Sequence, residues 1–211
     1  MIYLILTSSL ITNRFRMSTT SQRLEEYRSA ITETLSHLPN SIRPVIVENN
    51  GARLTCLDQF THNGKPVSVI YTENNKLITK SKGTNELFDL HEVIDKMDIQ
   101  PNDMIIKITG RYQATNSDFF RHVIEHEATY DGFVKFYNVC SLSFHPTDSV
   151  LGCYALRAFF IKGWNPYTIS HYPSAEVAFA KYVRLCGGKI KEMEQLGIRC
   201  HFSEDGRTLD V

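Results

Sequence analysis

The sequence has no excess of charge of either sign. Lys and Arg together number 23, and Asp and Glu also number 23, so the formal net charge is zero. Nonspecific nucleic-acid binding needs a basic surface, and this balance therefore argues against a nucleic-acid partner. A local basic pocket is still compatible with a neutral chain.

Long hydrophobic runs are also missing. The apolar stretch at residues 1–6 is short, and no segment approaches the roughly 18 apolar residues that a membrane span needs. No basic region precedes this stretch and no small-residue cleavage site follows it, so we expect a first strand rather than a signal peptide or a membrane span. We accordingly expect a soluble, cytoplasmic protein.

Cysteine is sparse, and its spacing fits no common motif. The five cysteines are widely separated and form no Cys-x-x-Cys pair. This pattern predicts reduced, mostly buried thiols and argues against disulfides or a zinc site. Cys140 and Cys153 lie in apolar stretches, where a thiolate is disfavoured, so a thiol nucleophile is not indicated either.

Several motifs of common enzyme classes are absent. The chain contains no Gly-x-x-x-x-Gly-Lys-Ser/Thr, no Gly-x-Gly-x-x-Gly and no Gly-x-Ser-x-Gly. P-loop, dinucleotide-binding and hydrolase sites are therefore not indicated. His122 and His126 have helical spacing for a shared metal, but no glutamate directly follows His122, and a solvated helix face is the better interpretation.

The chain does contain short apolar runs that alternate with helical periodicities. In the first half, apolar runs predict strands at residues 3–6, 44–47, 67–71 and 104–108, and helical spacing predicts helices at 21–38 and 87–97. In the second half we expect a helix at 118–126, a strand at 132–139, a strongly apolar helix at 150–161, a helix at 174–185 and a last strand at 198–202. The order predicts an α/β fold with a central, mostly parallel mixed sheet flanked by helices. Without a repeat or a low-complexity linker, we expect one domain over residues 1–211.

Polar side chains follow three of the predicted strands, and we expect them to meet at one edge of the sheet. The three strand exits are Thr7-Ser8, Glu48-Asn49-Asn50 and Thr109-Gly110-Arg111. Open α/β sheets bind ligands just beyond the carboxyl ends of their strands. Arg111 offers a planar cation that suits phosphate oxygens, and Gly110 lets backbone approach a ligand. A strand followed by an ordinary polar turn is the alternative interpretation.

Two further positions are candidates for a binding or catalytic role. The segment Lys82-Gly83-Thr84-Asn85-Glu86 opens a predicted helix, where free amides and Lys82 favour an anion, although a plain capped helix start explains it equally well. Asp148 precedes the predicted apolar helix at 150–161. It is either a helix N-cap or a general base on a pocket rim.

Taken in order, these segments resemble the GT-A class of nucleotide-sugar glycosyltransferases. The resemblance covers nearly the whole chain, and because each motif is short its specificity lies in their order. The chain looks most like a small glycosyltransferase domain encoded by large DNA viruses of algae, of the kind implicated in decorating capsid protein. The matching segments are Thr7-Ser8, Glu48-Asn49-Asn50-Gly51, Lys82-Gly83-x-x-Glu86, Ile105 to Tyr112, and Asp148-x-x-Leu151-Gly152.

The resemblance implies a nucleotide-binding half at about residues 1–115 and an acceptor half at about 116–211. It implies an inverting transfer of a hexose or deoxyhexose from a UDP-sugar to a glycan or glycoprotein acceptor, in the cytoplasm of a host cell if the protein is viral. A late acidic residue, matching Asp148, would deprotonate the acceptor hydroxyl. The donor would be bound by Thr7, Ser8, Glu48 and Asn49 around uridine, by Lys82 and Glu86 near the ribose or diphosphate, and by Thr109, Gly110 and Arg111 at the central strand end.

One feature of the GT-A class is missing. Its members usually carry Asp-x-Asp at the end of the central strand, where it holds Mn²⁺ against the diphosphate, and this sequence contains no Asp-x-Asp. Either Arg111 takes over part of the charge neutralisation, or Mn²⁺ (or Mg²⁺) is held by other carboxylates that the sequence does not identify.

Two other functions are considered beside glycosyl transfer. A nucleotidyltransferase that makes a nucleotide-sugar would share the sheet, but it normally carries a glycine-rich loop after the first strand, and residues 7–12 contain no glycine. A non-catalytic glycan-binding module of degenerate transferase fold is the other alternative, and the missing Asp-x-Asp is its best support.

Overall fold

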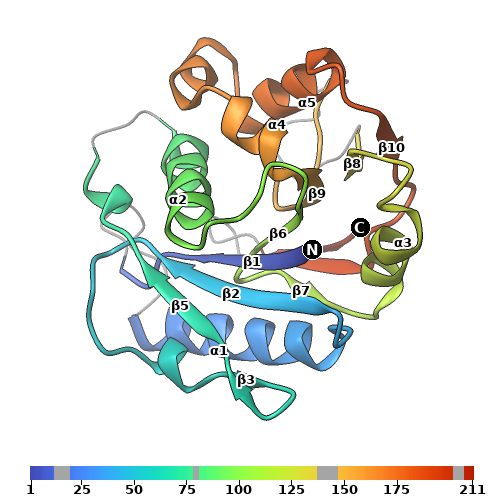
Figure 1. Ribbon diagram of the computed structural model, residues 1–211. Coiled ribbons are helices and arrows are strands. Elements are labelled where there is room, and N and C mark those ends of the chain that lie inside the picture. Colours follow the sequence, from blue (N-terminus) through green and yellow to red (C-terminus); the bar gives the residue numbers. More distant parts are fainter. Residues whose placement is uncertain (12–19, 78–80, 137–146, 202–206) are drawn as a thin grey trace.

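The computed structural model describes residues 1–11, 20–77, 81–136, 147–201 and 207–211, and a central seven-stranded sheet organises them (Figure 1). The strand order is β10-β8-β9-β6-β1-β2-β5. Strand β9 runs antiparallel to β6 and β8, and the other pairings are parallel, so the predicted mostly parallel mixed sheet is confirmed. The strands are β1 (Ile2–Ser8), β2 (Ile42–Glu48), β5 (Ser68–Tyr71), β6 (Met104–Thr109), β8 (Gly132–Val134), β9 (Cys153–Arg157) and β10 (Ile190–Glu192).

Helices cover both faces of this sheet, as Figure 1 shows. Helices α1 (Thr20–Ser36) and α3 (Asp118–His126) pack on one face, and α2 (Lys82–Lys96), α4 (Ala158–Gly163) and α5 (Ala175–Leu185) pack on the other. Strand β1 supplies both cores, because Leu4 and Leu6 face α1 while Tyr3 and Ile5 face α2 and α5. Burial on both faces explains why the first strand is a continuous apolar run.

Smaller elements complete the molecule. A three-stranded sheet is formed by β7 (Gln113–Ala114), β11 (Ile198–His201) and β12 (Thr208–Asp210), and a hairpin by β3 (Thr61–His62) and β4 (Lys65–Pro66). Short 3₁₀ helices are η1 (Cys56–Gln59), η2 (Asn74–Lys76) and η3 (Pro166–His171). Among the described residues, no helix is both long and apolar enough to cross a membrane. The four cysteines within this part of the chain form no disulfide with one another, and Cys140 lies outside it.

The prediction of an apolar helix at residues 150–161 is wrong. Residues 153–157 form strand β9 between β6 and β8, and only Ala158–Gly163 is helical. A short run that is apolar on all sides fits a doubly buried strand as well as a buried helix, so its periodicity alone did not decide. Asp148 therefore does not cap a helix, and the expected strand at 132–139 is shorter in the structure, with residues 137–139 outside the described part.

Strand register brings the predicted polar exits to one edge of the sheet. Thr7 of β1 lies opposite Val47 of β2 and Thr109 of β6, and Ser8 lies opposite Glu48. The strands therefore end side by side, and the residues that follow them share the same edge.

Candidate functional site

A cleft of about 230 Å³ opens at this edge of the sheet, where the ends of β1, β2 and β6 meet the first turns of α2 and α5. The arginine of the central strand exit and the small hydroxyl residues of the first strand do face one cleft, as expected. The predicted residues that line it are Thr7, Ser8, Asn49, Lys82, Glu86, Thr109 and Arg111. Glu48, Gly110 and Asp148 are not among its lining residues.

A buried lysine that we did not predict as a site residue lies at the centre of the cleft. Lys107 of β6 is only 1% exposed, and its Nζ lies 2.8 Å from Glu86 Oε2, 2.8 Å from Thr109 Oγ1 and 3.0 Å from the carbonyl oxygen of Leu151. A buried ammonium requires such compensation, since its desolvation penalty is several kcal/mol. The sequence signal was a charged residue in the middle of an apolar strand.

Glu86 connects α2 to the ends of both central strands. Besides Lys107, its carboxylate accepts hydrogen bonds from the hydroxyls of Thr7 and of Thr109, the latter at 3.3 Å. The side chain keeps 23% of its surface exposed toward the cleft that it lines. Glu86 is therefore a fixed acceptor group on the cleft floor whose negative charge is neutralised by Lys107.

Arg111 lines the cleft, and one of its donors is not used by the described residues. Its Nη1 lies 3.5 Å from Glu26 Oε2, and only 12% of the side chain is exposed. Its Nε is buried and has no hydrogen-bond partner among the described residues. A buried donor without a partner costs about 1–3 kcal/mol, so an anionic ligand that accepts from Arg111 would remove an existing penalty.

Arg23 of α1 is a second cation that the sequence did not single out. It is 8% exposed and lines the same cleft. Its Nε donates to the carbonyl oxygen of Ser9 at 2.7 Å, and its Nη2 donates to the hydroxyl of Tyr27 at 3.3 Å. Together with Lys82, Lys107 and Arg111, it gives the cleft a group of cations in a chain that has no net charge.

Gly110 has a different role from the one expected. A Cβ at this position would lie 2.8 Å from the backbone oxygen of Thr7 and 3.1 Å from the ring of Tyr27. The glycine therefore lets the end of β6 pack closely against β1 and α1, and in this structure its small size serves the protein's own packing rather than a ligand. Gly51, which follows Asn50 in an Asn-Gly pair, has a positive φ of 87°.

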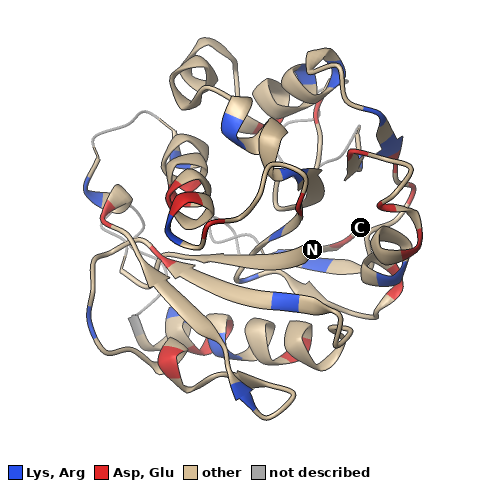
Figure 2. Cartoon of the chain, in the orientation of Figure 1, with Lys and Arg blue, Asp and Glu red and all other residues tan. Residues whose placement is uncertain are grey.

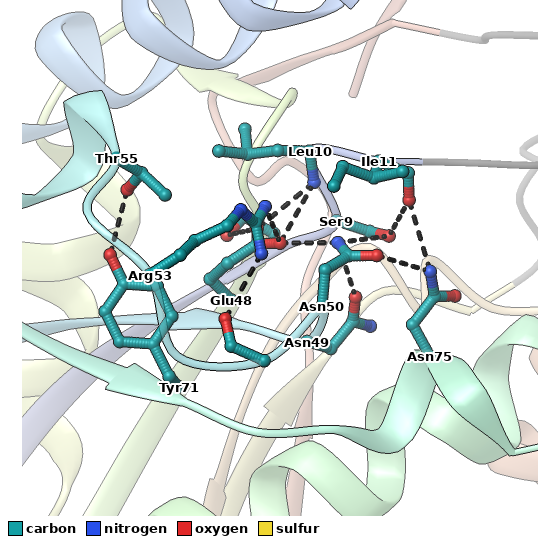
Figure 3. A network of polar contacts seen from close by, with 12 residues as sticks. Ser9, Leu10, Ile11, Glu48, Asn49, Asn50, Arg53, Thr55, Tyr71 and Asn75 are labelled. Atoms are coloured by element: carbon teal, nitrogen blue, oxygen red, sulfur yellow. Dashed lines mark hydrogen bonds and ion pairs between the residues drawn. The ribbon is translucent and has the colours of Figure 1, made fainter.

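Glu48 lies below the cleft surface and holds two loops together (Figure 3). The residue is 0% exposed. Its carboxylate accepts from the Ser8 hydroxyl at 2.9 Å, from the backbone N–H of Leu10 at 3.1 Å and from Arg53 at 3.0 Å, and also from the amide of Asn50. In the structure Glu48 therefore shapes the strand exits that surround the cleft and does not itself line it.

Asn49 reaches the cleft and is oriented by a buried acid. Its Nδ2 donates to Asp89 at 3.0 Å, and Asp89 also accepts from Thr72 at 2.5 Å and from Asn74 at 2.8 Å. Burial raises the pKa of Asp89 to about 7 against these hydrogen bonds, and the nearby charge of Glu86 raises it further. Asp89 thus connects the exits of β2 and β5 to α2.

Asp148 does not lie on the pocket rim. It is 0% exposed, and its Oδ1 accepts from the backbone N–H of Ser149 at 2.8 Å. The Ser149 hydroxyl donates to the carbonyl oxygen of Glu176 at 2.9 Å, which attaches this segment to the first turn of α5. Glu176 does line the cleft, and nothing in the sequence distinguished it from other acids at helix starts.

The metal that the GT-A resemblance implies has no ligand set in the described part of the chain. No group of three or more His, Cys, Asp or Glu residues there is arranged to hold a metal ion. Of the cleft carboxylates, Glu86 is paired with Lys107 and Asp89 accepts three hydrogen bonds. Hard divalent cations need several oxygen ligands close together, and Glu176, the third carboxylate that lines the cleft, does not complete such a group among the described residues. Cations and hydroxyl donors also line the cleft, and these suit a diphosphate.

The histidine pair of α3 is not part of the cleft lining. The rings of His122 and His126 lie 4.5 Å apart on α3, and they do not line the cleft. Burial is the main cause that lowers the pKa of His122, and the neighbouring His126 adds to it. This helix face is therefore not part of the candidate site.

Comparison with solved structures identifies the fold. A protein named as a nucleotide-diphospho-sugar transferase from Desulfovibrio desulfuricans superposes with a TM-score of 0.56 at 8% identity, covering 91% of this chain and 79% of that one. This chain has the nucleotide-diphospho-sugar transferase fold. No family model and no curated protein sequence matches it.

Two further solved structures show how widely this transferase fold is used. The bifunctional IspDF of Campylobacter jejuni aligns with a TM-score of 0.54 at 15% identity, over 99% of this chain and 51% of that one, so the chain spans about half of that protein. The 4-diphosphocytidyl-2C-methyl-D-erythritol synthase of Anaerococcus prevotii aligns with a TM-score of 0.53 at 12% identity, over 91% of this chain and 86% of that one. At such identities the likeness establishes the fold alone.

Proposed function

We propose that the protein is a glycosyltransferase that moves a hexose or deoxyhexose from a UDP-sugar to a glycan acceptor hydroxyl. The observation that carries the proposal is the cleft at the strand ends, which is lined by Arg111 together with the small hydroxyl and amide side chains of Thr7, Ser8 and Asn49. A guanidinium suits a diphosphate, and hydroxyl and amide groups suit a nucleoside.

The chemistry follows from the charges of the cleft. The acceptor oxygen attacks the anomeric carbon, the bond from that carbon to the diphosphate oxygen breaks, and UDP leaves with the electron pair. Negative charge grows on the leaving diphosphate, and fixed cations near it lower the barrier. Lys107 and Arg111 are the two cations at the end of the central strand.

The Mn²⁺ or Mg²⁺ dependence expected from the resemblance stays a prediction. The described carboxylates do not form a metal site. We therefore expect the cleft's own cations to neutralise the charge of the diphosphate. Inversion at the anomeric carbon, a cytoplasmic location and a viral capsid acceptor are likewise part of the proposal and are supported by the resemblance alone.

Calorimetry with UDP and with uridine tests the proposal directly. We expect UDP to bind in the presence of EDTA, and to bind at least tenfold more tightly than uridine, because two charge-assisted contacts to phosphate contribute on the order of 1.5–3 kcal/mol each. If UDP does not bind with EDTA or with Mn²⁺, the glycosyltransferase proposal fails and a glycan-binding module becomes the better reading. If UDP binds only with Mn²⁺, a metal ion and not the cleft's cations alone neutralises the diphosphate.

A nucleotidyltransferase is the second candidate, and one observation favours it. The chain covers 86% of a synthase whose name describes a diphosphocytidyl product. Such an enzyme joins a nucleoside triphosphate to a sugar or alcohol phosphate and releases pyrophosphate. Pyrophosphate release from UTP or CTP with a sugar 1-phosphate, without UDP release from UDP-sugars, would favour this second function.

A further inference from the structure

Three carboxylates line the cleft, and they differ in how they are held. Glu86 is ion-paired with Lys107 at 2.8 Å, and Asp89 is 1% exposed and accepts from three side chains. Glu176 takes part in no ion pair with the described residues, and Ser174 is its side-chain hydrogen-bond donor. Glu86 is a poor proton acceptor because Lys107 neutralises its charge, and Asp89 is almost fully buried, whereas Glu176 is only half-buried. Glu176 is therefore the cleft acid best placed to take up a proton from a bound molecule.

Glu176 also lies on the wall of the cleft that the nucleoside groups leave free. It belongs to the first turn of α5, beside the lining residues Leu151, Gly152 and Ala175 that approach β9. Thr7, Ser8 and Asn49 come from β1 and β2, further along the sheet. The first turns of α2 and α5 are closely packed beside Glu176, because a Cβ at Gly83 on α2 would lie 2.4 Å from the Cβ of Ala175.

We propose that Glu176 is the catalytic base that accepts the proton of the acceptor hydroxyl. This inference rests on the proposed glycosyl transfer. As the acceptor oxygen bonds to the anomeric carbon, its proton passes to the carboxylate of Glu176, and the electron pair of the broken bond leaves with UDP. The step needs no further reactant.

The surroundings of Glu176 strengthen it as a base. Burial raises the pKa of its carboxyl group above the ordinary value of 4.5, and the charges of Asp148 and Glu86 add to that rise. These are the charged groups that act on it, one from the segment before β9 and one from α2, while the Ser174 hydrogen bond opposes them. Asp148, fully buried, is then a positioning residue that acts through Glu176.

The test compares Glu176→Gln with a matched surface change, Glu33→Gln on α1, where Glu33 is 51% exposed and pairs with His37. UDP affinity is measured by calorimetry, and UDP release is measured from UDP-glucose, UDP-galactose and UDP-N-acetylglucosamine with water as acceptor. For Glu176→Gln we expect UDP affinity within about twofold of the wild type and a roughly 10²–10⁴-fold loss of turnover. Glu33→Gln should match the wild type in both.

The pH profile adds a readout that a structural role would not change. Wild-type turnover should fall in acid as Glu176 takes up its proton, and this acid limb should disappear in Glu176→Gln and move to lower pH in Asp148→Asn. Turnover of Glu176→Gln equal to the wild type overturns the inference while the proposed function stands. Loss of UDP affinity in that variant also overturns it, because Glu176 is then structural. A wild type that binds no UDP, or that releases none from these donors, overturns the proposed function itself.

Discussion

At the scale of single residues, Arg111 is the side chain that we expect to contribute most to binding of the proposed donor. Its Nε is buried without a partner among the described residues, so a diphosphate would gain a charge-assisted hydrogen bond there. We expect Arg111→Ala to weaken UDP binding by roughly 10–100-fold, from a loss of about 1.5–3 kcal/mol, and to change uridine binding by less than about threefold. Calorimetry measures both, with Arg28→Ala on the exposed face of α1 as the control. Equal losses for UDP and uridine would show that Arg111 supports the fold instead.

Lys107 and Glu86 form an ion pair that should be visible in stability. Removing one partner of a buried pair costs about 3–5 kcal/mol, and the 23% exposure of Glu86 favours the lower end. We expect Lys107→Met to lower the free energy of unfolding by about 3 kcal/mol, and the double variant Lys107→Met, Glu86→Gln to lose less than the sum of the two single changes. Urea unfolding of the four proteins measures the coupling. Strictly additive losses would contradict the pairing.

Asp89 should make stability depend on pH in a window that few carboxylates cover. Its pKa is raised to about 7 in the folded protein, mainly by burial, from 3.8 in the unfolded chain. The folded state therefore holds a proton that the unfolded state has lost between these values, and stability falls as pH rises, by up to about 1.4 kcal/mol per pH unit. Unfolding of wild type and Asp89→Asn from pH 4 to pH 8 measures it. The wild type should lose stability relative to the variant up to about pH 7 and then level off, and parallel curves would contradict the shift.

At the scale of elements, the starts of α2 and α5 must touch for the cleft to keep its shape. A Cβ at Gly83 would lie 2.4 Å from the Cβ of Ala175, which is closer than packed carbon atoms approach. We expect Gly83→Ala to destabilise the protein by about 1–3 kcal/mol through overpacking and to weaken UDP binding. Adding Ala175→Gly should restore the space and part of both losses. Thermal unfolding and calorimetry of the single and double variants measure this, and a double variant worse than both singles would show that the contact is not the cause.

The elements also show how far the sequence could lead. Strands β1, β2, β5 and β6 and the polar strand exits were predictable, because short apolar runs with turn signals mark buried parallel strands. The two-residue hairpin strands β3 and β4 were not predicted. Strand β9 was not, since its apolar run is equally typical of a buried helix. The other site residues that were not predicted have a related explanation. Arg23 and Glu176 lie on helices whose place around the cleft is decided by tertiary packing, which spacing along the chain does not encode.

At the scale of the whole molecule, zero net charge and a cationic cleft coexist. Figure 2 shows basic and acidic residues interspersed over helices, strands and loops. The cleft nevertheless gathers Arg23, Lys82, Lys107 and Arg111 beside its carboxylates. Such an arrangement favours a small anion that enters the cleft over a polyanion that needs an extended basic surface.

This contrast gives a prediction for the intact protein. We expect UDP affinity to weaken with added salt, and a 20-nucleotide single-stranded DNA to show no binding at about 150 mM salt, because nonspecific nucleic-acid binding comes from many phosphate contacts along a basic surface. Calorimetry at several salt concentrations measures the UDP affinity. Fluorescence anisotropy with labelled DNA measures DNA binding, and UDP is added as a competitor if DNA binds. If DNA binds tightly and UDP displaces it, the cleft binds nucleotides within a DNA strand. The zero net charge of the chain would then be a wrong guide to its partner.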